Sequence, residues 1–265
     1  VWRKGTRMIK IAFFDIDGTL LKLGCKELSP NTLAALQKLQ RNGILLCMAT
    51  GRSYPSIPHF TGIEFDIYLT FNGSYVVSHD RVIRNEPLHH DDVACIVRNL
   101  KHMNRAIAIS NTNSVVTNGT DPELEQYFSF GSSELIIADN FDELCNGDVF
   151  QIMCSCRKEE YSKILEGTTN TQITAWWDKA ADIIPLSGGK GAAVADVLKY
   201  FGFSKDEAIA FGDGINDIEM LQAAGTGVAM GNAKAAVKEM ADEICESVED
   251  DGVFTYCQAR NFFRE

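Results

Sequence analysis

The first third of the chain alternates short apolar runs with an amphipathic stretch. Residues 29–43 predict a helix, because Ser29 is a favoured N-cap residue, Pro30 occupies the first helical position and Gly43 follows the last turn. Three apolar runs around this helix read as buried strands: residues 8–14, 44–50 and 65–73. A strand, helix, strand, short helix, strand order is typical of a parallel sheet covered by helices. It indicates one end of a doubly wound fold.

The pattern changes after Gly73. Residues 74–88 predict a β-hairpin, and residues 90–103 predict an amphipathic helix. Further strands are expected at residues 106–110, 114–118, 148–156 and 172–178. We expect these elements to form an antiparallel sheet with helices on one face, in an inserted module that spans residues 83–183.

The first pattern returns in the last third of the chain, where a helix at residues 188–202 precedes further strands and helices. The sequence therefore predicts an α/β fold with a doubly wound (Rossmann-like) parallel-sheet core and an inserted α+β domain. The expected domains are the core, residues 1–82 and 184–265, and the insert, residues 83–183, with junctions near Asn85 and Pro185. Residues 1–7 are expected to be an extension outside this fold.

Composition and charge narrow the classes of function. The 265 residues are 45% hydrophobic and 23% charged, without a biased tract, which is typical of a soluble globular protein. A formal net charge of -11 without a basic block argues against nucleic acid and anionic membranes as partners. No apolar run approaches the roughly 18 residues of a membrane-spanning helix, and no secretory signal is visible. We therefore expect a cytoplasmic protein.

The eight cysteines are scattered along the chain, several of them inside apolar runs. Only Cys154 and Cys156 lie close together, and their spacing is not that of a CxxC motif. We expect buried free thiols, which argues against a zinc site or a cysteine-based redox centre.

Two carboxylates follow the first predicted strand directly, in the stretch FFDIDGTL. In an extended chain Asp15 and Asp17 project to the same side, with Cα atoms roughly 6 to 7 Å apart. Two anions at this distance repel, so either a cation lies between them or one of them is protonated. An EF-hand calcium loop is excluded, because Gly18 is at the fourth position rather than the sixth and Lys26 is at the twelfth. An ordinary acidic turn remains an alternative.

Three more stretches place suitable groups at the ends of predicted elements. ATGR ends the second strand with a hydroxyl and a glycine, and GGKG places Lys190 at a helix start, where an anion is favoured. FGDGINDIEM places Asp213 at a strand end and Asp217 one helical turn further on. In isolation each stretch has an ordinary explanation, as a turn, an exposed lysine or a helix cap.

As an ordered set, DIDGT, ATGR, GGKG and GDGIND resemble the haloacid dehalogenase superfamily, and specifically its Cof-type phosphatases with a large inserted α/β cap. The resemblance covers residues 8–265. It implies that Asp15 is a nucleophile that forms an aspartyl phosphate and that Asp17 is the general acid and base. It also implies Mg²⁺ as the cofactor, held by Asp15, the backbone carbonyl of Asp17, and Asp213, with Asp217 orienting this shell from behind.

The same resemblance implies a set of groups around the phosphate. Lys190 would act as a catalytic residue that, with Thr50, holds the phosphoryl oxygens and balances the carboxylate charge. Further candidates for contacts with the phosphate or with the rest of the substrate are Gly51, Arg52, Asn72 and Asn216. The paired Trp176 and Trp177 are expected in the apolar core of the cap.

The implied function is that of a Mg²⁺-dependent phosphomonoesterase for small phosphorylated metabolites, with sugar phosphates as the first expectation. A cap over the site suits a small substrate that can be enclosed. Two alternatives stay open. One is a phosphomutase of the same superfamily, and the other is a sugar-phosphate-binding protein without turnover.

Overall fold

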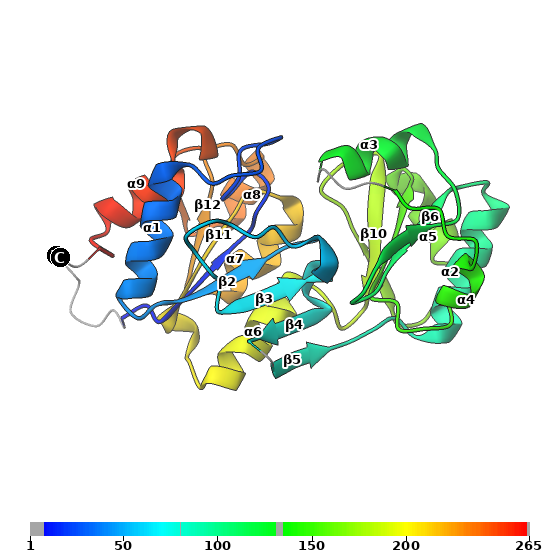
Figure 1. The fold of residues 1–265 in the computed structure, drawn as a ribbon, viewed down its shortest axis with the longest axis horizontal. Helices are drawn as coiled ribbons and strands as arrows, with labels where there is room; N and C mark the ends of the chain where they lie inside the picture. The colour runs from blue at the N-terminus through cyan, green and yellow to red at the C-terminus, as the bar shows by residue number, and fades with distance from the viewer. Residues whose placement is uncertain (1–7, 80, 131–134, 264–265) are drawn as a thin grey trace.

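The computed structural model describes residues 8–79, 81–130 and 135–263. These residues form an eight-stranded and a five-stranded sheet, which lie at opposite ends of the long axis of the molecule (Figure 1). The expected extension, residues 1–7, lies outside the described residues. None of the helices in the three described segments has the length and hydropathy that a membrane crossing requires.

The larger sheet has the strand order β13-β12-β11-β1-β2-β3-β4-β5. Its strands are β1 (Ile11–Phe14), β2 (Leu45–Ala49), β3 (Ile67–Thr70), β4 (Tyr75–Ser78), β5 (Arg81–Asn85), β11 (Ala208–Gly212), β12 (Thr226–Ala229) and β13 (Glu243–Ile244). Neighbours from β13 to β3 pair in parallel, whereas β4 and β5 pair antiparallel. The prediction of a doubly wound α/β core is confirmed.

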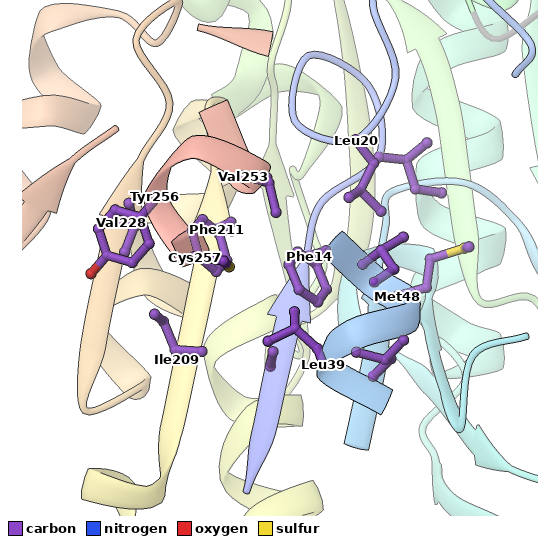
Figure 2. Close-up of a cluster of buried hydrophobic side chains, with 14 of the residues drawn as sticks. Phe14, Leu20, Leu39, Met48, Ile209, Phe211, Val228, Val253, Tyr256 and Cys257 are labelled. Carbon is purple, nitrogen blue, oxygen red and sulfur yellow. The ribbon is translucent and has the colours of Figure 1, made fainter. Parts of the chain in front are cut away.

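Helices cover both faces of the larger sheet because alternate strand residues point to opposite faces. One face, which includes Phe14, packs against α1 (Pro30–Arg41) and α9 (Gly252–Ala259). Figure 2 shows this cluster, in which the rings of Phe14 and Phe211 stack with centroids 5.3 Å apart. The other face packs against three helices, α6 (Lys190–Phe201), α7 (Ile218–Ala223) and α8 (Ala235–Met240).

Local signals explain where α1 begins and ends. The hydroxyl of Ser29 accepts a hydrogen bond of 3.0 Å from the backbone N–H of Thr32, as an N-cap residue should. Pro30 is the first helical residue, and Gly43 follows the helix with a φ of 73°. The helix predicted at residues 29–43 is therefore confirmed, together with the physical reasons for its two ends.

The predicted hairpin forms, but it belongs to the larger sheet. β4 pairs with β3, and β5 pairs with β4, so the hairpin extends the core sheet at its edge. The first expected boundary, between residues 82 and 83, falls inside β5, and the second, between 183 and 184, falls inside β10 (Ala180–Pro185) of the smaller sheet. The division of the chain into two domains stays a prediction.

The smaller sheet and its helices are called the cap from here on. Its strand order is β7-β6-β8-β10-β9, and its neighbours all pair antiparallel, as expected. Apart from β10, its strands are β6 (Ile107–Ser110), β7 (Val115–Thr117), β8 (Gln151–Ser155) and β9 (Thr171–Thr174). Its helices are α2 (His90–His102), α3 (Pro122–Phe130), α4 (Phe141–Leu144) and α5 (Tyr161–Ile164).

The expectation that helices cover only one face of the cap sheet is wrong. α2, α4 and α5 pack on one face, whereas α3 packs on the other through Leu124 and Phe128, which contact the cluster of Ala108 and Met153. The second face needs this cover because β6 and β8 carry apolar residues on both sides. α3 also brings its aromatic side chains toward the core.

Short 3₁₀ helices complete the described elements. They are η1 (Tyr54–Ser56), η2 (Phe71–Gly73), η3 (Lys158–Glu160), η4 (Lys205–Glu207), η5 (Ile215–Asp217) and η6 (Val248–Asp250). Two of them carry residues of the site described next: η2 follows β3 directly, and η5 follows the short turn after β11.

Candidate active site

The carboxyl ends of the central parallel strands bring the predicted acidic residues together. Asp15 follows β1 and Asp213 follows β11, and these strands pair in parallel with Phe14 opposite Phe211. The backbone N–H of Asp15 continues this pairing with a 3.0 Å hydrogen bond to the carbonyl of Phe211. Thr50 follows β2 on the other side of β1. The site therefore lies where the chain connections diverge, which is where open α/β sheets bind ligands.

Three carboxylates and one ammonium form the centre of this site. Asp15, Asp213 and Asp217 each offer one oxygen, and these oxygens lie within 4.8 Å of one another. Lys190 Nζ donates to Asp15 Oδ1 at 2.6 Å and to Asp217 Oδ1 at 2.5 Å. The lysine side chain has no solvent exposure. A single buried cation thus leaves two of the three negative charges without a matching positive charge.

Burial and like charge shift the protonation equilibria of this centre. Burial, followed by the charge of Asp217, holds the pKa of Asp15 well above its usual range and raises the pKa of Asp213 to about 7. Burial opposes the charged form of Lys190, but the carboxylates of Asp15 and Asp217 outweigh it and raise the lysine pKa. A further cation among these oxygens would relieve the repulsion, so the donor set fits a hard divalent metal ion.

The loop after β1 and the loop after β12 hold Asp213 in place. Gly18 has a φ of 92°, and a Cβ there would lie 2.3 Å from Asp213 Oδ2, so only glycine allows this approach. Thr19 donates to Asp213 Oδ1 at 3.1 Å, and Asn232 donates to Oδ2 at 3.3 Å and to the carbonyl of Gly18 at 2.9 Å. Thr19 and Asn232 were not among the residues predicted from the sequence. Their signals were the threonine of DIDGT and an asparagine just beyond a predicted strand.

Asp217 is fixed from behind the centre. Its Oδ2 accepts the backbone N–H groups of Asp213 and Gly214 at 3.0 and 2.8 Å, while its Oδ1 accepts from Lys190. The carboxylate is fully buried. Asp217 therefore ties the turn after β11 to the ammonium that contacts Asp15.

Asp17 pairs with Arg52 rather than with the acidic centre. Arg52 Nε and the second guanidinium nitrogen Nη2 donate to the two oxygens of Asp17 at 2.9 and 2.7 Å. The arginine reaches this position from the turn after β2, where its backbone N–H donates to Thr50 Oγ1 at 3.0 Å. Such a two-pronged pair fixes the orientation of both side chains.

A second polar cluster connects the core to the cap. Asn72 Nδ2 donates to Asp182 Oδ2 at 3.0 Å, and its Oδ1 accepts from Asn216 Nδ2 at 3.1 Å. Asp182 lies on β10 of the cap and also accepts a 2.5 Å hydrogen bond from the hydroxyl of Tyr127 on α3. The left-handed backbone of Asn72, with a φ of 51°, directs this amide between the two sheets. Neither Asp182 nor Tyr127 was predicted from the sequence.

A cavity of about 270 Å³ opens between the core and the cap. Of the catalytic, phosphate-binding and metal-binding residues implied by the sequence, those that line it are Asp15, Asp17, Thr50, Gly51, Arg52, Asp213 and Asn216. Lys190 and Asp217 lie behind this wall and act through their contacts with the residues that line it, and Asn72 lies between the wall and the cap. The structure thus brings the predicted catalytic, phosphate-binding and metal-binding residues into one region.

The buried carboxyl of Asp182 should make the stability of the protein depend on pH. Burial raises the pKa of Asp182 from 3.8 to about 6, so the folded protein binds more protons than the unfolded chain between these values. The free energy of unfolding therefore falls as pH rises through this window and stays reduced above it. In urea unfolding from pH 4 to 7, the stability of Asp182→Asn relative to the wild type should rise by roughly 2 kcal/mol.

The exposed Asp206 provides the control, because Asp206→Asn removes a carboxylate from the surface rather than from a buried position and should show no comparable pH dependence. A difference between Asp182→Asn and the wild type that stays constant from pH 4 to 7 would contradict the shifted titration.

The sequence as a whole matches a family described as haloacid dehalogenase-like hydrolase, over residues 12–256. The chain belongs to this family. The match spans both sheets, and it confirms the resemblance inferred from DIDGT, ATGR, GGKG and GDGIND.

Several proteins that are similar to this chain are named as phosphatases. YkrA of Bacillus subtilis strain 168, a putative phosphatase, is 28% identical over 247 residues, which make up 92% of this chain and 95% of YkrA. HMP-PP phosphatase of Escherichia coli O6:H1 is 32% identical over 245 residues, or 85% of each chain. The solved structure of the subclass IIB sugar phosphatase BT4131 has a TM-score of 0.85 at 26% identity, covering 96% of this chain and 99% of its own.

Proposed function

We propose that this chain is a Mg²⁺-dependent phosphatase that hydrolyses small phosphorylated metabolites through an aspartyl-phosphate intermediate. The observation that carries the proposal is the position of Asp15, which lines the cavity while Lys190 and two further carboxylates surround it. The names of the relatives support a phosphatase reaction. The cavity volume of about 270 Å³ supports a small substrate.

The donor set supports Mg²⁺ as the cofactor. Asp15, Asp213 and the backbone carbonyl of Asp17 would hold the ion, and Thr19 and Asn232 would orient Asp213. Bound there, Mg²⁺ would neutralise charge on the carboxylates and on the phosphoryl oxygens. Lys190 supplies fixed positive charge to the same region and stays protonated, because Asp15 and Asp217 stabilise its ammonium form.

The chain's own residues account for both steps of hydrolysis. The carboxylate of Asp15 attacks phosphorus, the bond to the leaving oxygen breaks, and Asp17 gives that oxygen a proton. Water then attacks the aspartyl phosphate and passes a proton to Asp17, which releases phosphate and restores Asp15. Arg52 holds both oxygens of Asp17, so this pair must open at one oxygen before Asp17 carries a proton. The Thr50 hydroxyl and the Gly51 backbone contact the phosphoryl group.

The position of the cap supports hydrolysis of an enclosed substrate. Its strands and α3 contribute side chains to the wall opposite Asp15, so a bound metabolite lies between the two sheets. We therefore place the two domains on either side of the cavity, with the chain crossing after Asn85 and after Pro185. The cytoplasmic location stays a prediction.

Metal removal tests this proposal. Activity should vanish in chelator and return with added Mg²⁺, because the carboxylates need a cation to accept an anionic substrate. Asp213→Asn should raise the Mg²⁺ concentration for half-maximal activity by more than about tenfold. The matched control is the same substitution at the exposed Asp206, which should leave Mg²⁺ dependence unchanged. Full turnover in a metal-free sample would refute the assignment.

The alternatives differ in what happens to the phosphoryl group. A phosphatase releases inorganic phosphate in proportion to the substrate consumed. A phosphomutase would return the group to another hydroxyl of the substrate, and a binding protein would leave the substrate intact. Simultaneous measurement of inorganic phosphate and of residual phosphate ester separates the three.

A further inference from the structure

The cavity has two chemically different halves. The core half carries Asp15, Asp17 and Arg52, which suit a phosphoryl group. Apart from the Tyr127 hydroxyl and the Gln151 amide, the cap half is apolar and aromatic, and it consists of Val115, Tyr127, Phe128, Phe130, Gln151, Met153 and Trp176. Among the described residues, the cap contributes no charged side chain to the cavity wall. The cap half would therefore contact the alcohol part of the substrate, which is the leaving group when the phosphate ester is cleaved.

Trp176 is a wall of this cavity rather than part of the cap core. Its hydrophobicity predicted a place in the apolar core, but it is only half-buried and belongs to neither cap cluster. Its ring centroid lies 5.4 Å from those of Tyr127 and Phe130, and the Phe130 ring meets it edge-on at 78°. These neighbours hold the indole ring in place from α3.

The polar atoms of the cap wall already have partners. The hydroxyl of Tyr127 donates to Asp182 at 2.5 Å. The Oε1 of Gln151 accepts a hydrogen bond of 3.5 Å from Asn72 Nδ2. A sugar ring can pack one face on a tryptophan, but its hydroxyls also need polar partners around the edge of the ring. This wall offers few such partners to a polyol.

We infer that the leaving group enclosed by the cap is a flat aromatic or heteroaromatic ring, joined to the phosphate by a short linker. The inference rests on the proposed phosphatase function and names its substrate class. Aromatic rings attract one another in stacked and edge-to-face arrangements beyond the effect of buried apolar area, and Trp176, Tyr127 and Phe130 offer both. A flat ring also leaves no hydroxyl without a partner.

The first test needs no variant. kcat/KM with Mg²⁺ is measured for 2-phenylethyl phosphate, 2-cyclohexylethyl phosphate and glucose 6-phosphate, since the first two differ mainly in aromaticity. We expect the phenyl ester to exceed the cyclohexyl ester by about threefold to tenfold, the range of an aromatic pair, and glucose 6-phosphate by at least about tenfold. Equal values for the phenyl and cyclohexyl esters, or a preference for glucose 6-phosphate, would overturn the inference.

The second test assigns the preference to Trp176. Trp176→Ala should lower kcat/KM for 2-phenylethyl phosphate about tenfold more than it lowers that for acetyl phosphate, which has no ring. Trp176→Phe should keep most of the preference. The matched control is Trp177→Ala, because Trp177 packs on Phe130 with centroids 5.3 Å apart but is not among the residues that line the cavity. It should keep the ratio of the two substrates within about twofold.

Acetyl phosphate distinguishes a wrong substrate class from a wrong phosphatase assignment. If the wild type hydrolyses it with Mg²⁺ but shows no aromatic preference, or if both tryptophan variants change the ratio equally, the substrate class is wrong and the phosphatase function stands. If the wild type hydrolyses neither acetyl phosphate nor any of the three esters, the proposed function fails and the inference fails with it. Thermal unfolding of each variant shows that the compared proteins are folded.

Discussion

Asp15→Asn should reduce phosphate release by at least about 10⁴-fold with every substrate, because an amide cannot replace the attacking carboxylate. The side chain keeps its size and can still contact Lys190, which lies 2.6 Å from Asp15 Oδ1, so folding should persist. The readout is phosphate release together with the mass of the acid-quenched protein, which should show no added phosphoryl group.

Asp17→Asn should behave differently, since its proposed role is proton transfer. Loss of general acid catalysis, worth about 10² to 10⁴-fold, should penalise an alkyl phosphate strongly but p-nitrophenyl phosphate much less, because nitrophenolate leaves without a proton. Water attack in the second step would lack its base. With the activated substrate, Asp17→Asn should therefore release a burst of nitrophenolate and accumulate phosphate on Asp15.

The two variants check each other. A nitrophenolate burst that survives in Asp15→Asn would mean that the nucleophile lies elsewhere. The absence of both burst and added mass in Asp17→Asn would count against a covalent intermediate that depends on Asp17 for its breakdown.

Lys190→Met should destabilise the protein and inactivate it. The substitution keeps a long side chain but leaves the carboxylates of Asp15 and Asp217 without their common ammonium in a fully buried position. Breaking a buried ion pair from one side typically costs about 3 to 5 kcal/mol. We expect a loss of this size in urea unfolding, and a decrease in kcat/KM of at least about 10³-fold from the lost positive charge.

A second substitution separates stability from catalysis. In Lys190→Met with Asp217→Asn, one buried charge is gone, the remaining oxygen can still accept the N–H groups of Asp213 and Gly214, and the new amide can donate toward Asp15. Stability should recover by half or more while activity stays low. The control is Lys199→Met on the same helix, where the lysine is exposed. If activity returned with stability, the ammonium would have no role in the reaction.

The convergence of the core residues could be predicted from the sequence because they follow directly from strand ends. Asp15, Thr50 and Asp213 each come just after a buried apolar run, and the carboxyl ends of neighbouring parallel strands meet at one edge. Short-range pattern therefore determines their convergence. Thr19 lay within the same motif, and it was missed because its hydroxyl serves Asp213, which is far along the chain.

Elements of the cap were harder to predict. β10 was missed because AADIIP, with two alanines, an aspartate and a proline, has weak strand propensity, and it becomes a strand by pairing with β8 and β9 on its two sides. α3 had a readable start, since Asp121 precedes Pro122 and caps the helix by accepting from the N–H groups of Glu123 and Leu124 at 3.1 and 2.9 Å. The helix itself was not among the predicted elements.

The contacts of Asp182 and Trp176 with the site were beyond any local pattern. Asp182 meets Asn72 across 110 residues of sequence, and this meeting depends on how the cap folds over the core. Trp176 has the hydrophobicity of a core residue, and only its position relative to α3 leaves a ring face on the cavity. Composition cannot distinguish these two environments.

The junction between core and cap is built without opposite charges. The Asn72 amide bridges Asp182 and Asn216, and the rings of Phe71 and Phe150 stack with centroids 5.1 Å apart. No ion pair between the described residues joins the two sheets. Added salt screens charges at the surface but hardly weakens stacked rings or buried amides. The enclosure should therefore keep its geometry across ionic strengths that weaken the capture of an anionic substrate, so salt would act on affinity and leave selectivity between leaving groups intact.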